Sequence, residues 1–225
     1  MEQIKMTFTV GIVGLGNIGF LYDMELPSSS ILSHSRAIDS HKSFTLEIGS
    51  DKNLELCQKF SDKYGVESSN DIRDFAGEFS PDVFIISSPT NTHLTTVKTI
   101  IKHFSPKAIL CEKPISYKLS EAKEIVNLCN ANKISLYVNY IRRADPAFIE
   151  LKKRISIGNI KGPYKAIVWY SKGLIHNGSH FVDLLNFLFG PIKSSTFLSK
   201  TNVTKFDADI DFKADFENGE AIFYS

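Results

Sequence analysis

The sequence predicts a two-part α/β protein, and three observations support this prediction. Over about the first 138 residues, short continuous apolar runs alternate with segments whose apolar residues recur at helical spacing. Glycines and polar residues follow the ends of these runs. After Tyr140 the pattern changes to helices and strands with one exposed face. We therefore expect a doubly wound parallel sheet in residues 1–139 and an α+β domain in residues 140–225.

Parallel strands account for the apolar runs of the first part, because such strands are covered on both faces. We expect strands at residues 7–13, 44–48, 83–86, 108–110 and 134–138. The helices between them are marked by apolar stripes at helical spacing, such as Leu54, Cys57, Phe60 and Tyr64. Gly65 stands where that helix needs a C-terminal glycine.

The second part begins with Asp145-Pro146, a helix start with aspartate as N-cap and proline at the first helical position. A strand over 164–170, a helix over 179–189 and an Asn218-Gly219 hairpin are expected next. We expect these elements to form a sheet of roughly three strands, antiparallel from residue 197 onward and incomplete at the chain end. We expect another subunit or further chain to cover its exposed face. The aromatic residues expected on that face are Tyr164, Trp169, Phe212 and Phe216.

Composition excludes several classes of protein. Lysine plus arginine (26) nearly equals aspartate plus glutamate (25), so no global field attracts nucleic acid or a membrane surface. The three cysteines are scattered without a C-x-x-C pair, so we expect buried thiols and neither a disulfide framework nor a metal site. We also expect no signal peptide, no membrane span and a cytoplasmic location.

Gly14-x-Gly16-x-x-Gly19 follows the first predicted strand, and a helix is expected after it. In a dinucleotide-binding turn the first glycine permits the tight turn and the second lets the backbone approach a pyrophosphate. The third lets the helix and strand pack closely. The motif in this context predicts a Rossmann nucleotide site. A plain strand-to-helix turn is the alternative interpretation.

Asp51 stands at the end of the second predicted strand, where an acidic residue accepts hydrogen bonds from the adenosine ribose. Its separation from the glycines is longer than usual, which we attribute to an inserted loop over residues 23–35. A carboxylate there favours NAD because it repels a 2′-phosphate, while Lys52 beside it leaves NADP open. The alternative is a surface aspartate that caps the helix at Asn53.

Three further motifs follow in order: Ser88-Pro89-Thr90-Asn91-Thr92-His93, Glu112-Lys113-Pro114 and His176-Asn177-Gly178-Ser179-His180-Phe181-Val182-Asp183. Together with the glycines they resemble the Gfo/Idh/MocA oxidoreductases, a family that includes glucose–fructose oxidoreductase and myo-inositol dehydrogenase. The resemblance covers essentially the whole chain. It implies a Rossmann domain and a second, α+β domain on a large, open, mostly antiparallel sheet, of which this chain would lack the C-terminal part.

Lys113 would lie at the carboxyl end of a parallel strand, where open α/β sheets bind ligands. Its ammonium could bind a substrate hydroxyl and stabilise developing alkoxide charge. The resemblance identifies Lys113 as the family's lysine and His180 as its base or hydroxyl ligand. It also implies that Pro114 fixes the turn, often through a cis bond, and that Glu112 orients the lysine or contacts the nicotinamide ribose. An exposed turn lysine and a core histidine are the alternatives.

Family members commonly carry an aspartate four residues before this histidine, and His176 occupies that position here. The departure implies a different sugar class or weaker dehydrogenase chemistry. Asp183 would hold the His180 imidazole or serve as a structural carboxylate. Arg142, like Arg143, is a candidate for an anionic substrate group, with a surface salt bridge as the alternative. Asn177 completes the candidate substrate residues. The cofactor-binding candidates are Gly14, Gly16, Asn17, Ile18, Gly19, Asp51, Ser88, Pro89, Thr90, Asn91, His93, Glu112 and Lys113.

These motifs predict an NAD(P)-dependent oxidoreductase that transfers a hydride between a nicotinamide cofactor and a secondary hydroxyl or keto group. The cofactor is NAD or NADP, with NAD favoured. The expected substrate is a sugar, sugar derivative or cyclitol, and the expected protein partner is a second copy bound through the C-terminal sheet. A catalytically silent or truncated dinucleotide-binding protein is the alternative, because the expected second domain is incomplete and the family's aspartate is absent at position 176. A methyltransferase would give the Glu-Lys-Pro motif no role.

Overall fold

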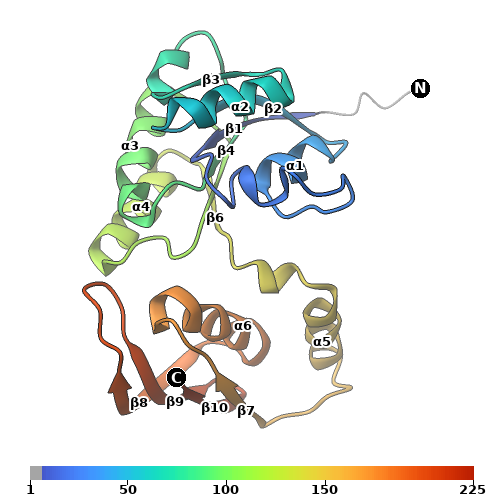
Figure 1. Cartoon of the computed structure of the whole chain (residues 1–225). Helices are drawn as coiled ribbons and strands as arrows, with labels where there is room; N and C mark the ends of the chain where they lie inside the picture. Colours follow the sequence, from blue (N-terminus) through green and yellow to red (C-terminus); the bar gives the residue numbers. More distant parts are fainter. Residues whose placement is uncertain (1–6) are drawn as a thin grey trace. The chain divides into compact units, whose positions relative to one another are not determined.

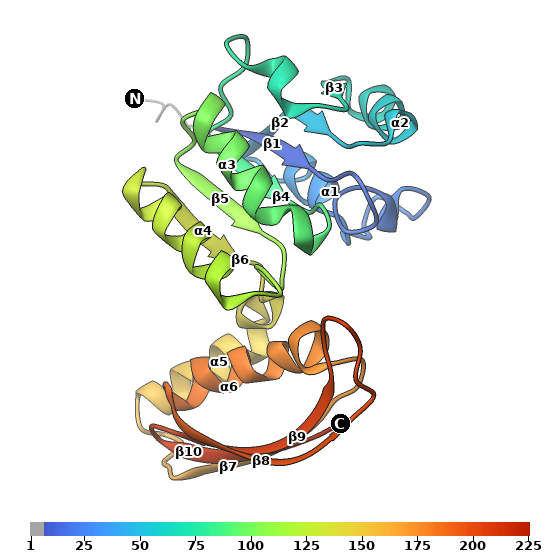
Figure 2. The same cartoon turned by 90° about the vertical axis from the view of Figure 1, so that its left-hand side faces the viewer.

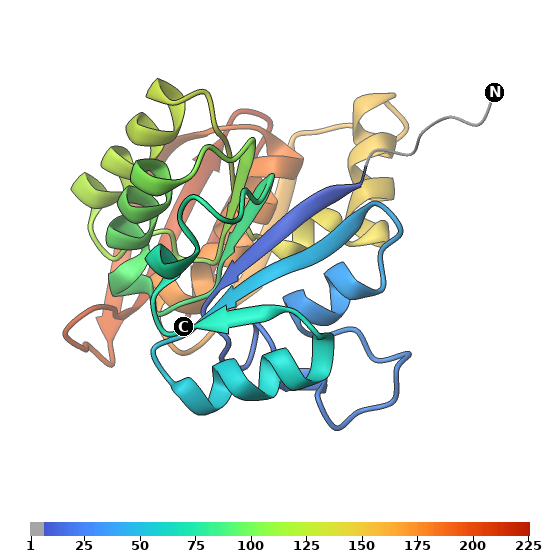
Figure 3. The same cartoon turned by 90° about the horizontal axis from the view of Figure 1, so that it is seen from above.

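Six parallel strands form the sheet of the N-terminal unit in the computed structural model, which describes residues 7–225 (Figure 1). The strands are β1 (Phe8–Val13), β2 (Phe44–Ser50), β3 (Glu67–Ser69), β4 (Val83–Ile86), β5 (Ala108–Cys111) and β6 (Ser135–Val138). Their order is β3-β2-β1-β4-β5-β6, so the direction of winding reverses between β1 and β4. The strands run side by side in the same direction (Figure 3), as the doubly wound prediction requires.

Helices cover both faces of this sheet (Figure 2). They are α1 (His34–Asp39), α2 (Leu54–Tyr64), α3 (His93–His103) and α4 (Leu119–Ala131). Alternate residues of one strand enter different cores: Phe84 and Ile86 pack with α3 and α4, whereas Ile85 packs with α2. This alternation explains why β4 is a continuous apolar run.

The elements predicted for this unit differ from the structure at two places. The sequence does not predict β3, because its residues Glu-Ser-Ser contain no apolar side chain that could mark a buried strand. The helix expected after Gly19 starts later in the chain than the motif suggests. A wide turn and the short 3₁₀ helix Leu21–Asp23 follow the glycines, and the first α-helix starts only at His34.

The second unit starts at Tyr140 and has a four-stranded sheet within the described residues. Its strands are β7 (Tyr164–Trp169), β8 (Ile192–Thr201), β9 (Asp209–Phe216) and β10 (Gly219–Tyr224), in the order β7-β10-β9-β8. The β9–β10 hairpin at Asn218-Gly219 is antiparallel as predicted, whereas β7 pairs with β10 in parallel. Helices α5 (Pro146–Ser156) and α6 (Ser179–Phe189) lie on the concave face of the curved sheet (Figure 2).

The aromatic face expected on this sheet is only partly correct. Phe212 and Phe216 are buried with α6 in the core, because alternate residues of β9 point to opposite faces. Tyr164 is half-buried and stacks on Phe189. Trp169 alone of the predicted set is well exposed, at 73 %, and it stacks on Tyr224.

The three cysteines, Cys57, Cys111 and Cys129, are free thiols buried in the two cores of the first unit. Burial raises the pKa of Cys111 to about 12, so this thiol stays protonated at neutral pH. Across residues 7–225, every helix is too short or too polar to cross a bilayer. The N-terminal residues 1–6, to which the signal-peptide prediction refers, lie outside the described residues.

Candidate nucleotide and substrate site

The three glycines after β1 have different surroundings. Gly14 has a φ of +100°, and a Cβ there would clash with the main chain of Ser87 and Ser88. A Cβ on Gly19 would clash with the carbonyl oxygen of Gly14. Around Gly16 the space is open to 4 Å. Packing therefore requires two of the glycines, and Gly16 is the position at which the backbone leaves room for a ligand.

Asp51, at the end of β2, contacts this glycine-rich loop. Its Oδ2 accepts a hydrogen bond from the Leu15 amide at 2.7 Å, and its Oδ1 accepts one from the Asn53 amide at 2.9 Å. The helix cap itself is Asn53, whose side chain accepts from the Glu55 amide. Lys52 donates to the Asn70 carbonyl at 3.1 Å. The open glycine position and the Asp51 carboxylate thus lie on one loop system, and both fit an adenine dinucleotide.

The loop after β4 is held by its own side chains. The Ser88 and Thr92 hydroxyls are hydrogen-bonded at 2.8 Å, and Thr92 donates to the Pro89 carbonyl at 2.7 Å. His93 is fully buried. Its Nε2 lies 2.9 Å from the Ser88 carbonyl oxygen and its Nδ1 lies 3.1 Å from that of Ile115. His93 therefore joins the loop after β4 to the loop after β5, while Asn91 is exposed on the first of them.

Glu112, Lys113 and Pro114 follow β5, and the Lys113–Pro114 peptide bond is cis. The Glu112 carboxylate accepts hydrogen bonds from the Asn139 side chain at 2.7 Å and from the Lys113 amide at 3.2 Å. A third contact joins its Oε1 to His34 Nε2 at 2.8 Å. Burial alone would raise the pKa of Glu112, but the hydrogen bonds from His34 and Asn139 and the charge of His34 hold this pKa below its usual value. Glu112 is therefore an ionised carboxylate beside the main chain of Lys113.

The inserted segment before His34 is more ordered than a surface loop. Asp23 is fully buried, and its carboxylate accepts from the Leu32 amide and from the amide and hydroxyl of Ser33, each at 2.7 Å. Arg36 lies 3.6 Å from the same carboxylate and donates to the carbonyls of Leu26, Pro27 and Ser30. The insertion returns to the glycine-rich loop, where the His34 amide donates to the Ile18 carbonyl at 2.9 Å.

In the second unit, His180 lies in the first turn of α6 and is 7 % exposed. The ring of Tyr140 meets its imidazole edge-on, with 5.8 Å between the ring centroids. Burial raises the pKa of Tyr140, against an opposing hydrogen bond with Ser179. His180 is thus a buried imidazole that lies against the ring of a phenol.

The two arginines and Asp183 form surface interactions within this unit. Arg143 binds Asp183 through two hydrogen bonds, at 2.6 and 2.7 Å, and the guanidinium of Arg142 lies 4.9 Å from the ring centroid of Phe181. Arg143 therefore forms a salt bridge, which is the alternative interpretation that the sequence left open for the two arginines. Asp183 is the carboxylate of that pair.

His176 lies in a π-helical turn, Leu174–Gly178, directly before α6. Its amide and that of Ile175 donate to the Asp207 carboxylate at 2.8 and 2.9 Å. The Asn177 side chain donates to the Ser171 carbonyl at 3.0 Å. A carboxylate therefore lies beside position 176 in this chain, supplied by Asp207 rather than by residue 176 itself.

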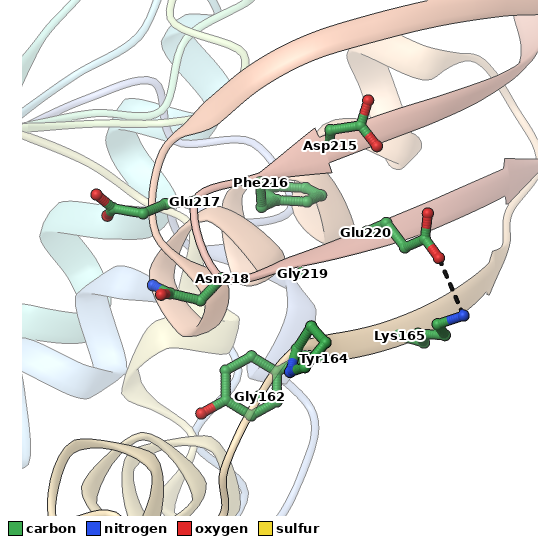
Figure 4. Close-up of a pocket in the computed structure, with 10 residues that line it drawn as sticks. Gly162, Tyr164, Lys165, Asp215, Phe216, Glu217, Asn218, Gly219 and Glu220 are labelled. Carbon is green, nitrogen blue, oxygen red and sulfur yellow. Dashed lines mark ion pairs between the residues drawn. The ribbon is translucent and has the colours of Figure 1, made fainter.

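A shallow depression of about 620 Å³ lies elsewhere in this unit, between the start of β7 and the β9–β10 turn (Figure 4). Lys165 and Glu220 form an ion pair of 3.3 Å on its wall. Its lining, all of it within the described residues, includes none of the predicted site residues. Residues 7–225 also show no cluster of three or more histidine, cysteine or acidic side chains arranged for a metal ion.

Four residues with contacts at the site are not indicated by any sequence motif: His34, Asn139, Tyr140 and Asp207. Ser33 could have indicated a helix start at His34, since serine is a preferred N-cap and its hydroxyl accepts from the Arg36 amide. No local pattern indicates that the His34 ring meets Glu112, 78 residues away.

Comparison with known proteins places the first unit in a family. The sequence pattern of the family described as "Oxidoreductase family, NAD-binding Rossmann fold", GFO_IDH_MocA, matches residues 8–140. The uncharacterized oxidoreductase YrbE of Bacillus subtilis is 28 % identical over 155 residues, which are 68 % of this chain and 41 % of that protein. The myo-inositol 2-dehydrogenase of Thermotoga maritima is 26 % identical over 156 residues, 69 % of this chain and 42 % of that protein.

A solved structure, the WlbA dehydrogenase of Bordetella pertussis in complex with NADH and UDP-GlcNAcA, shares the fold with a TM-score of 0.79 at 19 % identity. The alignment covers 97 % of this chain and 66 % of that one. The matched part of the chain thus spans less than half the length of each of the two sequence relatives. The motifs, the strand order and the family pattern agree, and the chain belongs to the Gfo/Idh/MocA oxidoreductases.

Proposed function

We propose that this chain binds NAD(P) and takes part in hydride transfer between the nicotinamide and a secondary hydroxyl or keto group of a sugar, sugar derivative or cyclitol. The observation that supports this most directly is the open position at Gly16, in a loop whose other glycines are needed for packing and whose Leu15 amide binds Asp51. The names of the relatives, which include inositol dehydrogenases, support the substrate class.

The proposed roles follow from the chemistry of the side chains. When bound, the nicotinamide would accept or donate the hydride. Lys113, after β5, would bind the substrate oxygen and stabilise the negative charge that develops on it. His180 would take the hydroxyl proton as the hydride leaves. Ionised Glu112 would fix the main chain of Lys113 through the Lys113 amide.

NAD is the favoured cofactor in this proposal. The Asp51 carboxylate is held by two amides at the position where an adenosine ribose would lie, and a 2′-phosphate there would meet a negative charge. Lys52, the neighbouring cation, donates to the Asn70 carbonyl.

We also propose that the chain self-associates through the second sheet. The Trp169–Tyr224 stack, with Trp169 73 % exposed, supports this, because a partner that covered it would bury a large aromatic surface.

The test of the nucleotide site is titration calorimetry with NADH and NADPH on the wild type, Gly16→Ala and Gly16→Val. The wild type should bind NADH more tightly than NADPH. The side chain of Gly16→Val should occupy the space of the phosphates and abolish binding, with Gly16→Ala intermediate. The melting temperature should change little, because no atom lies within 4 Å of the added Cβ.

A Gly16→Val variant that keeps its affinity for both nucleotides would contradict the proposed site. A wild type that strongly prefers NADPH would contradict the role of Asp51. A scan of sugars and inositols for nicotinamide absorbance change, run on the wild type, would then identify the substrate class.

A further inference from the structure

We propose that His34 is a positioning residue that braces Glu112, and through it the Lys113 main chain, for the nicotinamide half of the dinucleotide. The inference rests on the proposed nucleotide site. It concerns a residue of the insertion that neither the motifs nor the proposed mechanism uses.

The contact between His34 and Glu112 is short and sheltered. His34 Nε2 and Glu112 Oε1 are 2.8 Å apart, and the two side chains are 12 % and 13 % exposed. An ionised carboxylate only accepts hydrogen bonds, so Nε2 must carry the hydrogen and donate it. Hydrogen bonds to a charged acceptor are stronger than neutral ones.

The same carboxylate collects donors from three segments of the first unit. His34 comes from the start of α1, Asn139 follows β6, and the third donor is the Lys113 amide. The His34 amide itself donates to Ile18 in the glycine-rich loop. The bracing group formed by His34, Glu112 and Asn139 therefore ties the loops after β1, β5 and β6 together.

The place of this bracing group in the sheet points to the dinucleotide. The strand order reverses between β1 and β4, and a dinucleotide lies across such a reversal at the carboxyl ends of the strands. The half of the sheet with β1, β2 and Asp51 takes the adenosine, so the half with β4 to β6 takes the nicotinamide. His34 reaches from the first half to Glu112 in the second.

The insertion delivers His34 to this place in a fixed conformation. The Asp23 carboxylate holds the Leu32 and Ser33 amides, and Ser33 in turn is the N-cap of α1. A carboxylate at 0 % exposure with three donors leaves the segment before His34 little freedom. A brace set in this way should act on the nicotinamide end without changing how the adenosine end binds.

Binding of two ligands, ADP and NADH, distinguishes the adenosine end of the site from the nicotinamide end. ADP carries the adenosine and both phosphates, whereas NADH adds the second ribose and the nicotinamide. We expect His34→Leu to weaken NADH binding about tenfold in calorimetry, the scale of one hydrogen bond to a charged group, and to leave ADP binding unchanged. The fluorescence anisotropy of bound NADH should fall, because the nicotinamide is held less firmly.

Rescue and control variants distinguish bracing from general damage. His34→Gln keeps a nitrogen donor near the position of Nε2 and should restore most of the NADH affinity, and Asn139→Ala should resemble His34→Leu. The control is His41→Leu, the same change at an exposed histidine. His41 lies near the start of β2, at the end of the strands opposite to the proposed site, so this variant should bind both ligands like the wild type.

An equal effect of His34→Leu on ADP and NADH, no effect on either, or a His34→Gln variant as weak as His34→Leu would each overturn the inference. A wild type that binds neither NADH nor NADPH would overturn the proposed function instead.

Discussion

Asp23 offers the sharpest test of how the insertion is held. Replacing it by alanine removes the acceptor of three hydrogen bonds. It also removes the carboxylate beside the guanidinium of Arg36, a residue that is only 8 % exposed. Each hydrogen bond to a charged group contributes about 1.5–3 kcal/mol, and these contributions overlap because one carboxylate serves all. Breaking a buried pair from one side costs about 3–5 kcal/mol, which we expect as the loss of local stability in Asp23→Ala.

Amide hydrogen exchange measures this loss at the residues concerned. The amides of Leu32 and Ser33 should exchange at least about 10²-fold faster in Asp23→Ala, since every 1.4 kcal/mol is a factor of ten. The control is Asp62→Ala, which removes an exposed carboxylate that accepts from Gln58 and should change stability by at most about 0.5 kcal/mol. Equal exchange rates at Leu32 in the two variants would refute the reasoning.

The pH dependence supplies a second check. Burial acts to raise the pKa of Asp23, but the hydrogen bonds from Ser33 and Leu32 and the charge of Arg36 lower it on balance. A carboxyl group with a lowered folded-state pKa contributes its full stability above its unfolded pKa of about 4. This contribution is lost as the pH falls through the folded pKa. The stability difference between wild type and Asp23→Asn should therefore shrink in acid, and a difference that grows there would contradict the assignment.

Three further predictions concern the second unit and the proposed chemistry. Lys113→Met and His180→Gln should each lower the turnover number by about 10²–10⁴-fold with little change in NADH affinity. The double variant should turn over little more slowly than the slower of the two single variants. Near-normal turnover on the identified substrate would contradict these roles and favour a catalytically silent dinucleotide-binding protein. His176→Asp should preserve or raise turnover if this position touches substrate, and an unchanged KM with lost turnover would argue against such contact. Trp169→Lys should shift the chain toward monomer in light scattering, and a wild type that is monomeric at high concentration would refute self-association through the sheet.

The sequence by itself determined most of the strands and helices and the class of reaction that the motifs indicate. The apolar runs at β1, β2, β4 and β5 predict buried parallel strands because burial on both faces leaves no polar alternation. The glycine motif predicts a tight turn after β1, and a Cβ at Gly14 or Gly19 would indeed clash with the backbone there. Asp145-Pro146 and Asn218-Gly219 predict a helix start and a hairpin through local backbone preferences, and both elements form as predicted.

Only the tertiary structure decided what the polar side chains of the site contact. Asp23, within a Pro- and Ser-rich stretch, is buried because Leu32 and Ser33 fold back onto its carboxylate. Glu112 meets His34, and Asp207 meets the His176 amide, although 78 and 31 residues separate the partners. Such contacts depend on which strand ends the topology brings together, and no local periodicity encodes them. Phe212 and Phe216 show the same limit, because only the packing of α6 decides which face of β9 is buried.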